Sequence, residues 1–232
     1  MLSGDICRNL KTDLFHNANI PEVITAVYEH DRSWIQLDSM LKVNPATLTP
    51  YSFNDYPLEE KLDFYVQGLN EIEKINSYSG LLCSLHYTSF FDAVSSPESF
   101  SFVEKEKQRQ EKILHELGHI DQSLIMSHLN ILQFCDRLSL YVCLNDPGVP
   151  KELEHQWYWV GIRYSEKLNP AGNKPIITRW ISKSEVQVIG FPFGDDFEST
   201  LRFGRISKED INSIGIDPEK VAWEEQKIIF RR

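Results

Sequence analysis

The segment LNDPGVP, residues 144–150, divides the sequence into two parts with different hydrophobic patterns. Its two prolines and its glycine interrupt regular secondary structure. Before it, from Pro21 to about Asn145, apolar residues recur at the spacing of one helix face. Clear examples are Leu58, Leu62, Tyr65, Val66, Leu69, Ile72 and Ile75, and then Ile113, Leu117, Ile120 and Leu124. The first two-thirds of the chain is therefore predicted to be helical.

After this segment, short runs rich in Trp, Ile, Val and Phe alternate with turns, which is typical of strands. The runs are QWYWVGIRY (156–164), PIITRWI (175–181), EVQVIGFPFG (185–194), TLRFGRI (200–206) and QKIIFRR (226–232). We expect an α+β protein. A mainly helical region over residues 1–148 would be followed by a small antiparallel sheet over residues 149–232 that packs on the helices as one compact unit.

Composition limits the classes of partner. The chain has 232 residues, 41% of them hydrophobic, and five tryptophans, which is enough for a sizeable core. Its 34 acidic and 24 basic side chains give a net charge of −10, which argues against binding a nucleic-acid backbone or an anionic membrane. No stretch is long and apolar enough for a transmembrane helix or a secretory signal, so we expect a cytoplasmic protein. The oligomeric state is not predicted.

The spacing of the four cysteines is not that of a zinc knuckle or of a disulfide framework. Cys7, Cys83, Cys135 and Cys143 form no CxxC pair, and each stands beside apolar residues. We expect buried, reduced thiols.

The segment HELGH, residues 115–119, matches the HExxH motif of zinc proteases. On a continuous helix, His115 and His119 would share one face and Glu116 would be the general base. The elongated form of this motif requires glycine and histidine where the chain has Gln122 and Ile125. A solvated helix face is therefore the favoured interpretation, and a zinc metalloprotease remains a remote alternative.

Polar residues interrupt the apolar pattern at three other places. His30 and Asp31 end the predicted apolar helix PEVITAVYEHD, residues 21–31, His86 lies within GLLCSLHYTSFF, and Asp136 lies within LQFCDRLSLYVCL. Buried ionisable groups are usually paired, hydrogen-bonded or bound to metal. Three such places on three helices suggest one shared site. A buried polar network, in which Asp136 pairs with Arg137 or Arg32, is an equally good interpretation.

A resemblance adds to these observations. Together, EHDRSW, SLHYTSFF, LQFCDRLSLYVCLN and GFPFG resemble an uncharacterised bacterial family known only as a domain of unknown function, over nearly the whole chain. The helical part is in turn similar to the HD-domain superfamily of metal-dependent phosphohydrolases. That likeness implies an HD-like helical bundle with a divalent ion, Zn, Mn, Fe or Mg, held by His30, Asp31, His86 and Asp136.

The superfamily carries one further histidine before the doublet, and here the chain departs from its pattern. The only histidine before His30 is His16, in a predicted loop. A catalytically degenerate relative that binds a small ligand or a partner is therefore the alternative to an active phosphohydrolase.

The chemistry implied by the resemblance is hydrolysis of a phosphoester of unknown identity. Asp31 would be a ligand or a base, and Arg32 or Arg137 would neutralise phosphate charge, since a guanidinium bonds two phosphate oxygens at once. For Arg137, a salt bridge to Asp136 is the simpler alternative. We expect the substrate pocket to be lined by Trp34, Tyr87 and Phe90.

Overall fold

The computed structural model describes residues 1–91, 96–212 and 215–232, which form two compact units. The first unit contains residues 1–28, 118–201 and 226–232, and the second contains residues 29–117 and 202–225. Each unit is therefore built from segments that are separated in the sequence. The change of pattern near residue 148 predicts another division, between a helical region and a β-rich region. That division differs from the two units and stays a prediction.

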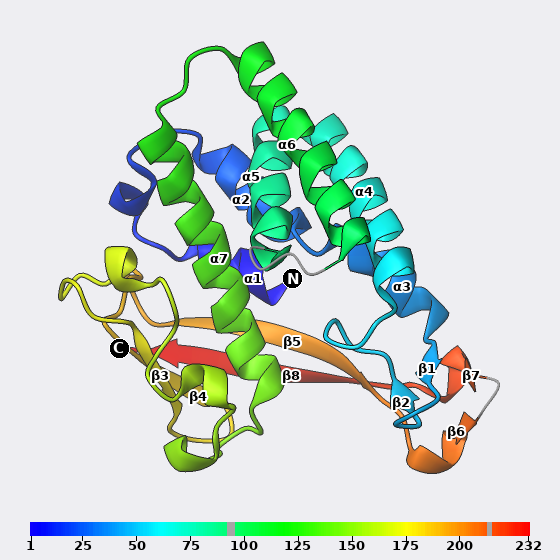
Figure 1. The fold of residues 1–232 in the computed structure, drawn as a ribbon. Helices are drawn as coiled ribbons and strands as arrows, with labels where there is room; N and C mark the ends of the chain where they lie inside the picture. Colours follow the sequence, from blue (N-terminus) through cyan, green and yellow to red (C-terminus); the bar gives the residue numbers. More distant parts are fainter. Residues whose placement is uncertain (92–95, 213–214) are drawn as a thin grey trace. The chain divides into compact units, whose positions relative to one another are not determined.

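The second unit is mainly helical (Figure 1). Its helices α4, α5 and α6 lie side by side, and α3 packs on α4. Leu62, Tyr65, Leu69 and Ile72 form a buried stripe along α4, as the helical spacing predicts. The elements are α3 (Arg32–Met40), β1 (Val43–Asn44), β2 (Thr49–Pro50), α4 (Leu58–Ile75), α5 (Ser77–Thr88), η2 (Ser89–Phe91), α6 (Pro97–Leu117), η6 (Lys208–Asp210), β6 (Ile211–Asn212), β7 (Gly215–Ile216) and η7 (Pro218–Lys220).

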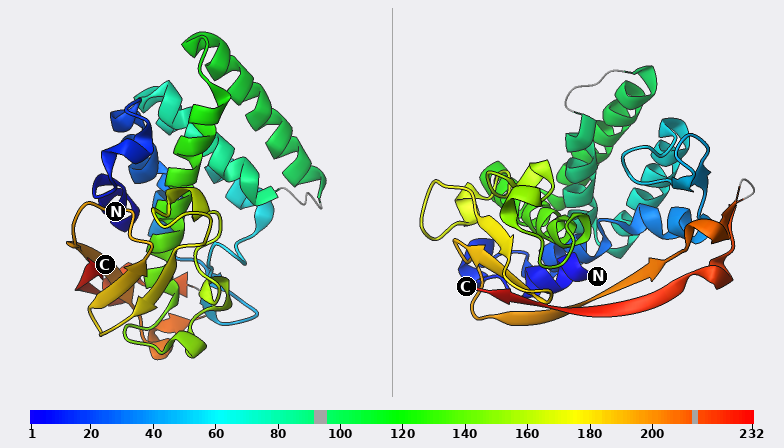
Figure 2. Two further views of the ribbon diagram at one scale, coloured as in Figure 1. Left: turned by 90° about the vertical axis from the view of Figure 1, so that its left-hand side faces the viewer. Right: turned by 90° about the horizontal axis from the view of Figure 1, so that it is seen from below.

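The first unit is built around α7 (Gln122–Leu144), a long helix that is apolar on most of its circumference. A helix of this kind is covered on several sides. Helix α1 (Leu2–Arg8) lies against it, as Figure 2 shows. The remaining helical elements are η1 (Thr12–Phe15), α2 (Ile20–Glu29), η3 (Lys151–Leu153), η4 (Gln156–Tyr158) and η5 (Glu166–Leu168).

The C-terminal strands form a four-stranded sheet in the order β3-β4-β8-β5. The strands are β3 (Ile177–Trp180), β4 (Glu185–Ile189), β5 (Phe197–Arg205) and β8 (Ala222–Arg231). Strands β3 and β4 are antiparallel, with Thr178 opposite Val188, whereas β4 and β8 are parallel, with Val186 opposite Phe230. The α+β class is confirmed. The sheet is mixed and not wholly antiparallel, because β8 inserts between β4 and β5 and runs in the direction of β4.

Within the first unit the sheet packs on α7. Phe134 of α7 contacts Phe193 with ring centroids 6.2 Å apart, and Tyr141 stacks on Trp180 at 6.3 Å. Phe193 belongs to the GFPFG segment and is fully buried. This segment therefore closes the core.

Residues 156–164 do not form the predicted strand. They form η4 followed by an irregular turn, in which Gly161 has a φ of +105° and Tyr164 a φ of +63°. Left-handed backbone cannot continue a strand. An isolated bridge between Ile162 and Ile176 is the β pairing that this segment makes within the described residues.

Two further expectations can be compared with the structure. Cys7, Cys83 and Cys135 are buried as expected, but Cys143 is exposed, which corrects its expected burial. It lies next to the last residue of α7, Leu144. Among the described residues, the helices are each too short or too polar to cross a bilayer.

Candidate metal centre

The doublet His30 and Asp31 lies in the turn between two helices. Helix α2 ends at Glu29 and α3 begins at Arg32, which corrects the expected helix over residues 21–31. In a helix, adjacent side chains point about 100° apart, and a turn removes this restriction. The imidazole Nε2 of His30 accordingly lies 3.3 Å from Oδ2 of Asp31. The two side chains therefore face each other.

His86 lies beside His30 in the second unit. It occupies the last turn of α5 and is 3% exposed, while His30 is 2% exposed. Their ring centroids are 5.7 Å apart, and a nitrogen of one ring lies within 4.8 Å of a nitrogen of the other. Two buried imidazoles thus lie together, with a carboxylate beside one of them, as the interruptions of the apolar pattern predict.

A tyrosine holds the turn that carries the doublet. The Tyr87 hydroxyl donates a hydrogen bond to the backbone carbonyl of His30 at 2.8 Å. Tyr87 is 1% exposed. It therefore supports the turn from within the core, in place of the pocket lining expected for it.

The other two predicted pocket residues also lie in the second unit. Trp34 packs edge to face on Tyr56 and on Tyr65, with ring centroids 5.9 Å apart in both pairs. Phe90 is half exposed, and its ring lies 4.7 Å from that of His86. Phe90 is thus in direct contact with a candidate ligand.

Asp31 acts on its neighbours through its charge. Partial desolvation and the negative charge of Asp31 raise the pKa of Asp38. Burial and the same charge raise the pKa of Tyr65. Asp38 is not among the residues predicted for the site. It stands seven positions after Asp31 and four after Trp34, a spacing that places the three on one helix face.

Arg32 is already engaged by two carboxylates. Its Nη1 lies 2.5 Å from Oε2 of Glu29 and its Nε lies 2.8 Å from Oε2 of Glu71. The hydrogen bonds to these two carboxylates raise the pKa of Arg32. Binding a phosphate here would require breaking these contacts, so Arg32 is a poor candidate for the role predicted for it.

Asp136 and Arg137 lie on α7 of the first unit, and both are partly buried. Burial lowers the pKa of Arg137, while the charge of Asp136 acts in the opposite direction. Within the described residues, Arg137 forms no salt bridge with Asp136 or another carboxylate, contrary to the simpler alternative. The role of Asp136 as a metal ligand stays a prediction from the sequence, and so does the catalytic role of Arg137.

The HELGH segment does not form the face that a zinc protease needs. Helix α6 ends at Leu117, Gly118 has a φ of +77°, and α7 begins at Gln122. His119 therefore lies outside both helices. His115, Glu116 and His119 are all exposed, as predicted, but only the first two are helical.

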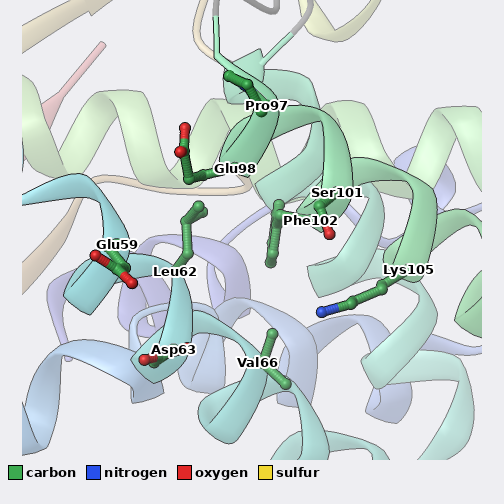
Figure 3. A pocket seen from close by; sticks show the side chains of 9 residues that line it. All are labelled: Glu59, Leu62, Asp63, Val66, Pro97, Glu98, Ser101, Phe102 and Lys105. Atoms are coloured by element: carbon green, nitrogen blue, oxygen red, sulfur yellow. The ribbon is translucent and has the colours of Figure 1, made fainter.

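The structure also contains surface pockets in the second unit. One, of about 350 Å³, lies between α4 and α6, with Leu62 and Val66 on one side and Phe102 on the other (Figure 3). None of the predicted site residues lines it. A second, of about 240 Å³, begins directly after the doublet and is lined by Arg32, Ser33, Ile35, Gln36, Phe64, Gln67, Gly68 and Glu71.

Comparison with known proteins identifies the family. The family described as "Protein of unknown function (DUF3891)" matches residues 1–208. The chain belongs to that family. This confirms the predicted membership of a family of unknown function, whereas the likeness to the HD-domain superfamily and a bacterial origin stay predictions. No curated protein and no solved structure matches the chain.

Proposed function

We propose that the protein is a metal-dependent phosphohydrolase of HD-like type. The observation that carries the proposal is the pair of buried imidazoles, His30 and His86, next to the carboxylate of Asp31. Burying two histidines with a carboxylate is costly unless they bond to one another or to an ion. The second unit brings the two buried histidines together and places the half-exposed carboxylate of Asp31 beside His30.

The donor atoms fit a divalent metal ion. Imidazole nitrogen and carboxylate oxygen are the usual ligands of Zn, and Mn and Fe accept the same set. Two ligand atoms bonded to one tetrahedral ion at about 2.1 Å lie about 3.4 Å apart. The 3.3 Å between His30 Nε2 and Asp31 Oδ2 is close to that value. A bound ion would supply a water of lowered pKa and would polarise a phosphoryl oxygen.

The residues of the chain have separate roles in this proposal. His30, Asp31 and His86 are ligands, and Asp136 is the further ligand that the sequence predicts. Asp31 is half exposed and also has the position of a base. Tyr87 fixes the backbone of His30. Arg137, without a carboxylate partner among the described residues, binds phosphate charge.

One observation favours a second candidate, a catalytically degenerate protein that binds a small ligand or a partner. His16, the only histidine before the doublet, is exposed and ends η1 with a φ of +53°. It lies in the first unit, on the surface. A site without the first histidine of the superfamily would bind metal more weakly or not at all.

The first experiment is elemental analysis of protein purified without a histidine tag. Wild type, His30→Ala, Asp136→Ala and His119→Ala are compared, the last as a control histidine outside the site. We expect metal in wild type and in His119→Ala, and its loss in His30→Ala. Metal-dependent turnover of phosphoesters is then measured on the same samples. Equal metal content in wild type and His30→Ala would refute the proposed site, and metal without turnover would favour the binding protein.

A further inference from the structure

Two arginines of the first unit lie against the same aromatic ring. The guanidinium carbon Cζ of Arg137 is 5.0 Å from the ring centroid of Tyr164, and that of Arg163 is 5.4 Å from it. Arg137 also donates a hydrogen bond to the backbone carbonyl of Arg163, at 3.4 Å. Helix α7 and the turn after η4 thus bring two cations together.

Neither guanidinium has a carboxylate partner in the ranges 1–91, 96–212 and 215–232. Other arginines of this acidic chain do have carboxylate partners. Arg32, Arg109 and Arg231 each bond two carboxylates. Like charges held close together repel each other unless an anion lies between them. The Tyr164 ring attracts both guanidinium groups through its face and so helps to hold the pair.

The turn that presents these side chains is rigidly built. The Ser165 hydroxyl donates to the carbonyl of Ile162 at 2.6 Å and accepts from the backbone N–H of Ile176 at 2.7 Å. Gly161 has a φ of +105°, and a Cβ there would meet the carbonyl oxygen of Ile176 at 2.8 Å. The backbone before Ser165 is therefore fixed.

The backbone of Tyr164 is strained, although the contacts of its side chain do not require this conformation. Its φ of +63° is rare for a bulky residue, and its side chain is 56% exposed. Strained residues persist where the surrounding structure holds them, and they are concentrated at functional sites. Here the strained residue places an exposed ring against two arginines.

We propose that Arg137, Arg163 and Tyr164 form a binding site for the phosphate group of a phosphate monoester. Guanidinium groups bond tetrahedral oxyanions through paired N–H donors, and two of them match the double charge of a monoester. The inference deepens the proposed function, on which the choice of phosphate rests. Binding of an oxyanion by the two arginines does not require turnover.

The test is calorimetric binding of inorganic phosphate to the protein of residues 1–232. We compare wild type with Arg137→Gln, Arg163→Gln and the matched control Arg202→Gln, which removes an exposed arginine 4.7 Å above the Trp223 ring. Loss of a charged hydrogen bond weakens binding by about tenfold or more. We expect that loss in Arg137→Gln and Arg163→Gln and none in Arg202→Gln. No binding by wild type at millimolar phosphate, or equal binding by Arg163→Gln and Arg202→Gln, would overturn the inference.

Tyr164→Gly separates binding from folding. Glycine accepts a positive φ without strain, so the midpoint of unfolding should be unchanged or higher while phosphate binding weakens. Binding equal to that of wild type would count against a role for the ring.

Turnover distinguishes the inference from the proposed function. Arginine-dependent phosphate binding in a protein that hydrolyses no phosphoester would leave the binding site standing and refute the hydrolase. Metal-dependent hydrolysis by wild type, with equal phosphate binding by wild type and Arg163→Gln, would do the reverse.

Discussion

The hydroxyl of Tyr87 lies 2.8 Å from the carbonyl oxygen of His30, which is 57 positions earlier in the sequence. The residue before Tyr87 is His86. Helix α5 therefore supplies one candidate ligand, His86. The next side chain of the same helix, Tyr87, fixes the turn that carries another candidate ligand, His30. Tyr87 and His30 are both buried, so the bond is shielded from competing water.

We expect Tyr87→Phe to weaken metal binding as well as stability. The ring stays and only the hydrogen bond to His30 is lost, which should lower the free energy of unfolding by about 1–3 kcal/mol because a buried carbonyl loses its donor. Urea unfolding and metal titration measure the two effects. Tyr56→Phe is the control, since the buried Tyr56 hydroxyl has no hydrogen-bond partner among the described residues. Metal affinity equal to that of wild type in Tyr87→Phe would show that the bond does not position His30.

Metal should stabilise the wild-type protein against unfolding. An ion that binds only the folded state, at a free concentration about 100 times its Kd, raises the free energy of unfolding by about 2.7 kcal/mol. Thermal unfolding with and without added Zn or Mn measures the shift. His86→Ala should lose it and His119→Ala should keep it. If both variants respond as wild type does, the stabilising ion is bound elsewhere.

Gly68→Ala should disrupt the packing of α3 on α4. A Cβ at Gly68 would lie 2.2 Å from Oγ of Ser33 and 2.8 Å from its backbone N, so the helices would have to separate. Overpacking of this kind costs about 1–3 kcal/mol. Gly194→Ala, where no atom lies within 4 Å of the added methyl group, is the matched control and should be nearly neutral. Chemical denaturation of both variants decides whether the close approach is needed.

Asp5 should make the stability of the first unit depend on acidity. Burial acts to raise the pKa of Asp5, but hydrogen bonds from Tyr28 at 2.6 Å and Ser199 at 2.7 Å outweigh it and hold the pKa below its usual 3.8. The unfolded chain therefore takes up this proton first as the pH falls. The stabilisation is complete above pH 3.8 and is lost as the pH falls through the lower pKa of the folded state.

The comparison for this prediction is Asp5→Asn. Wild type should be more stable than the variant at neutral pH, and the difference should shrink as the pH falls below 3.8. Unfolding midpoints in urea at pH 3, 5 and 7 measure the difference. A constant difference across this range would mean that the Asp5 carboxylate is not the titrating group.

Much of the fold follows from local patterns in the sequence. The buried stripe of α4 and the apolar surface of α7 are visible as spacing, and the Gly and Pro residues after Leu144 end the helical part. The parallel pairing of β4 with β8 is not visible, because strands predicted separately carry no information on which neighbour each will choose.

The candidate site was only partly predictable for the same reason. Polar residues in apolar segments marked His30 and His86 correctly as buried neighbours. The periodic pattern extended α2 through the doublet, whereas the chain turns there. Contacts made far along the chain, such as those of Arg32 with Glu71 and of Arg137 with Tyr164, depend on packing and leave no local signal.

The division of the chain into interleaved segments has a consequence for its synthesis. Residues 29–117 form most of the second unit and leave the ribosome as one continuous stretch. Residues 1–28 emerge earlier, but the helix and strands that complete their unit are translated afterwards, at 118–201 and 226–232. Domains usually complete their folding in the order in which they are translated. In this protein we expect the reverse, with the apolar face of α1 exposed to chaperones until α7 has left the ribosome.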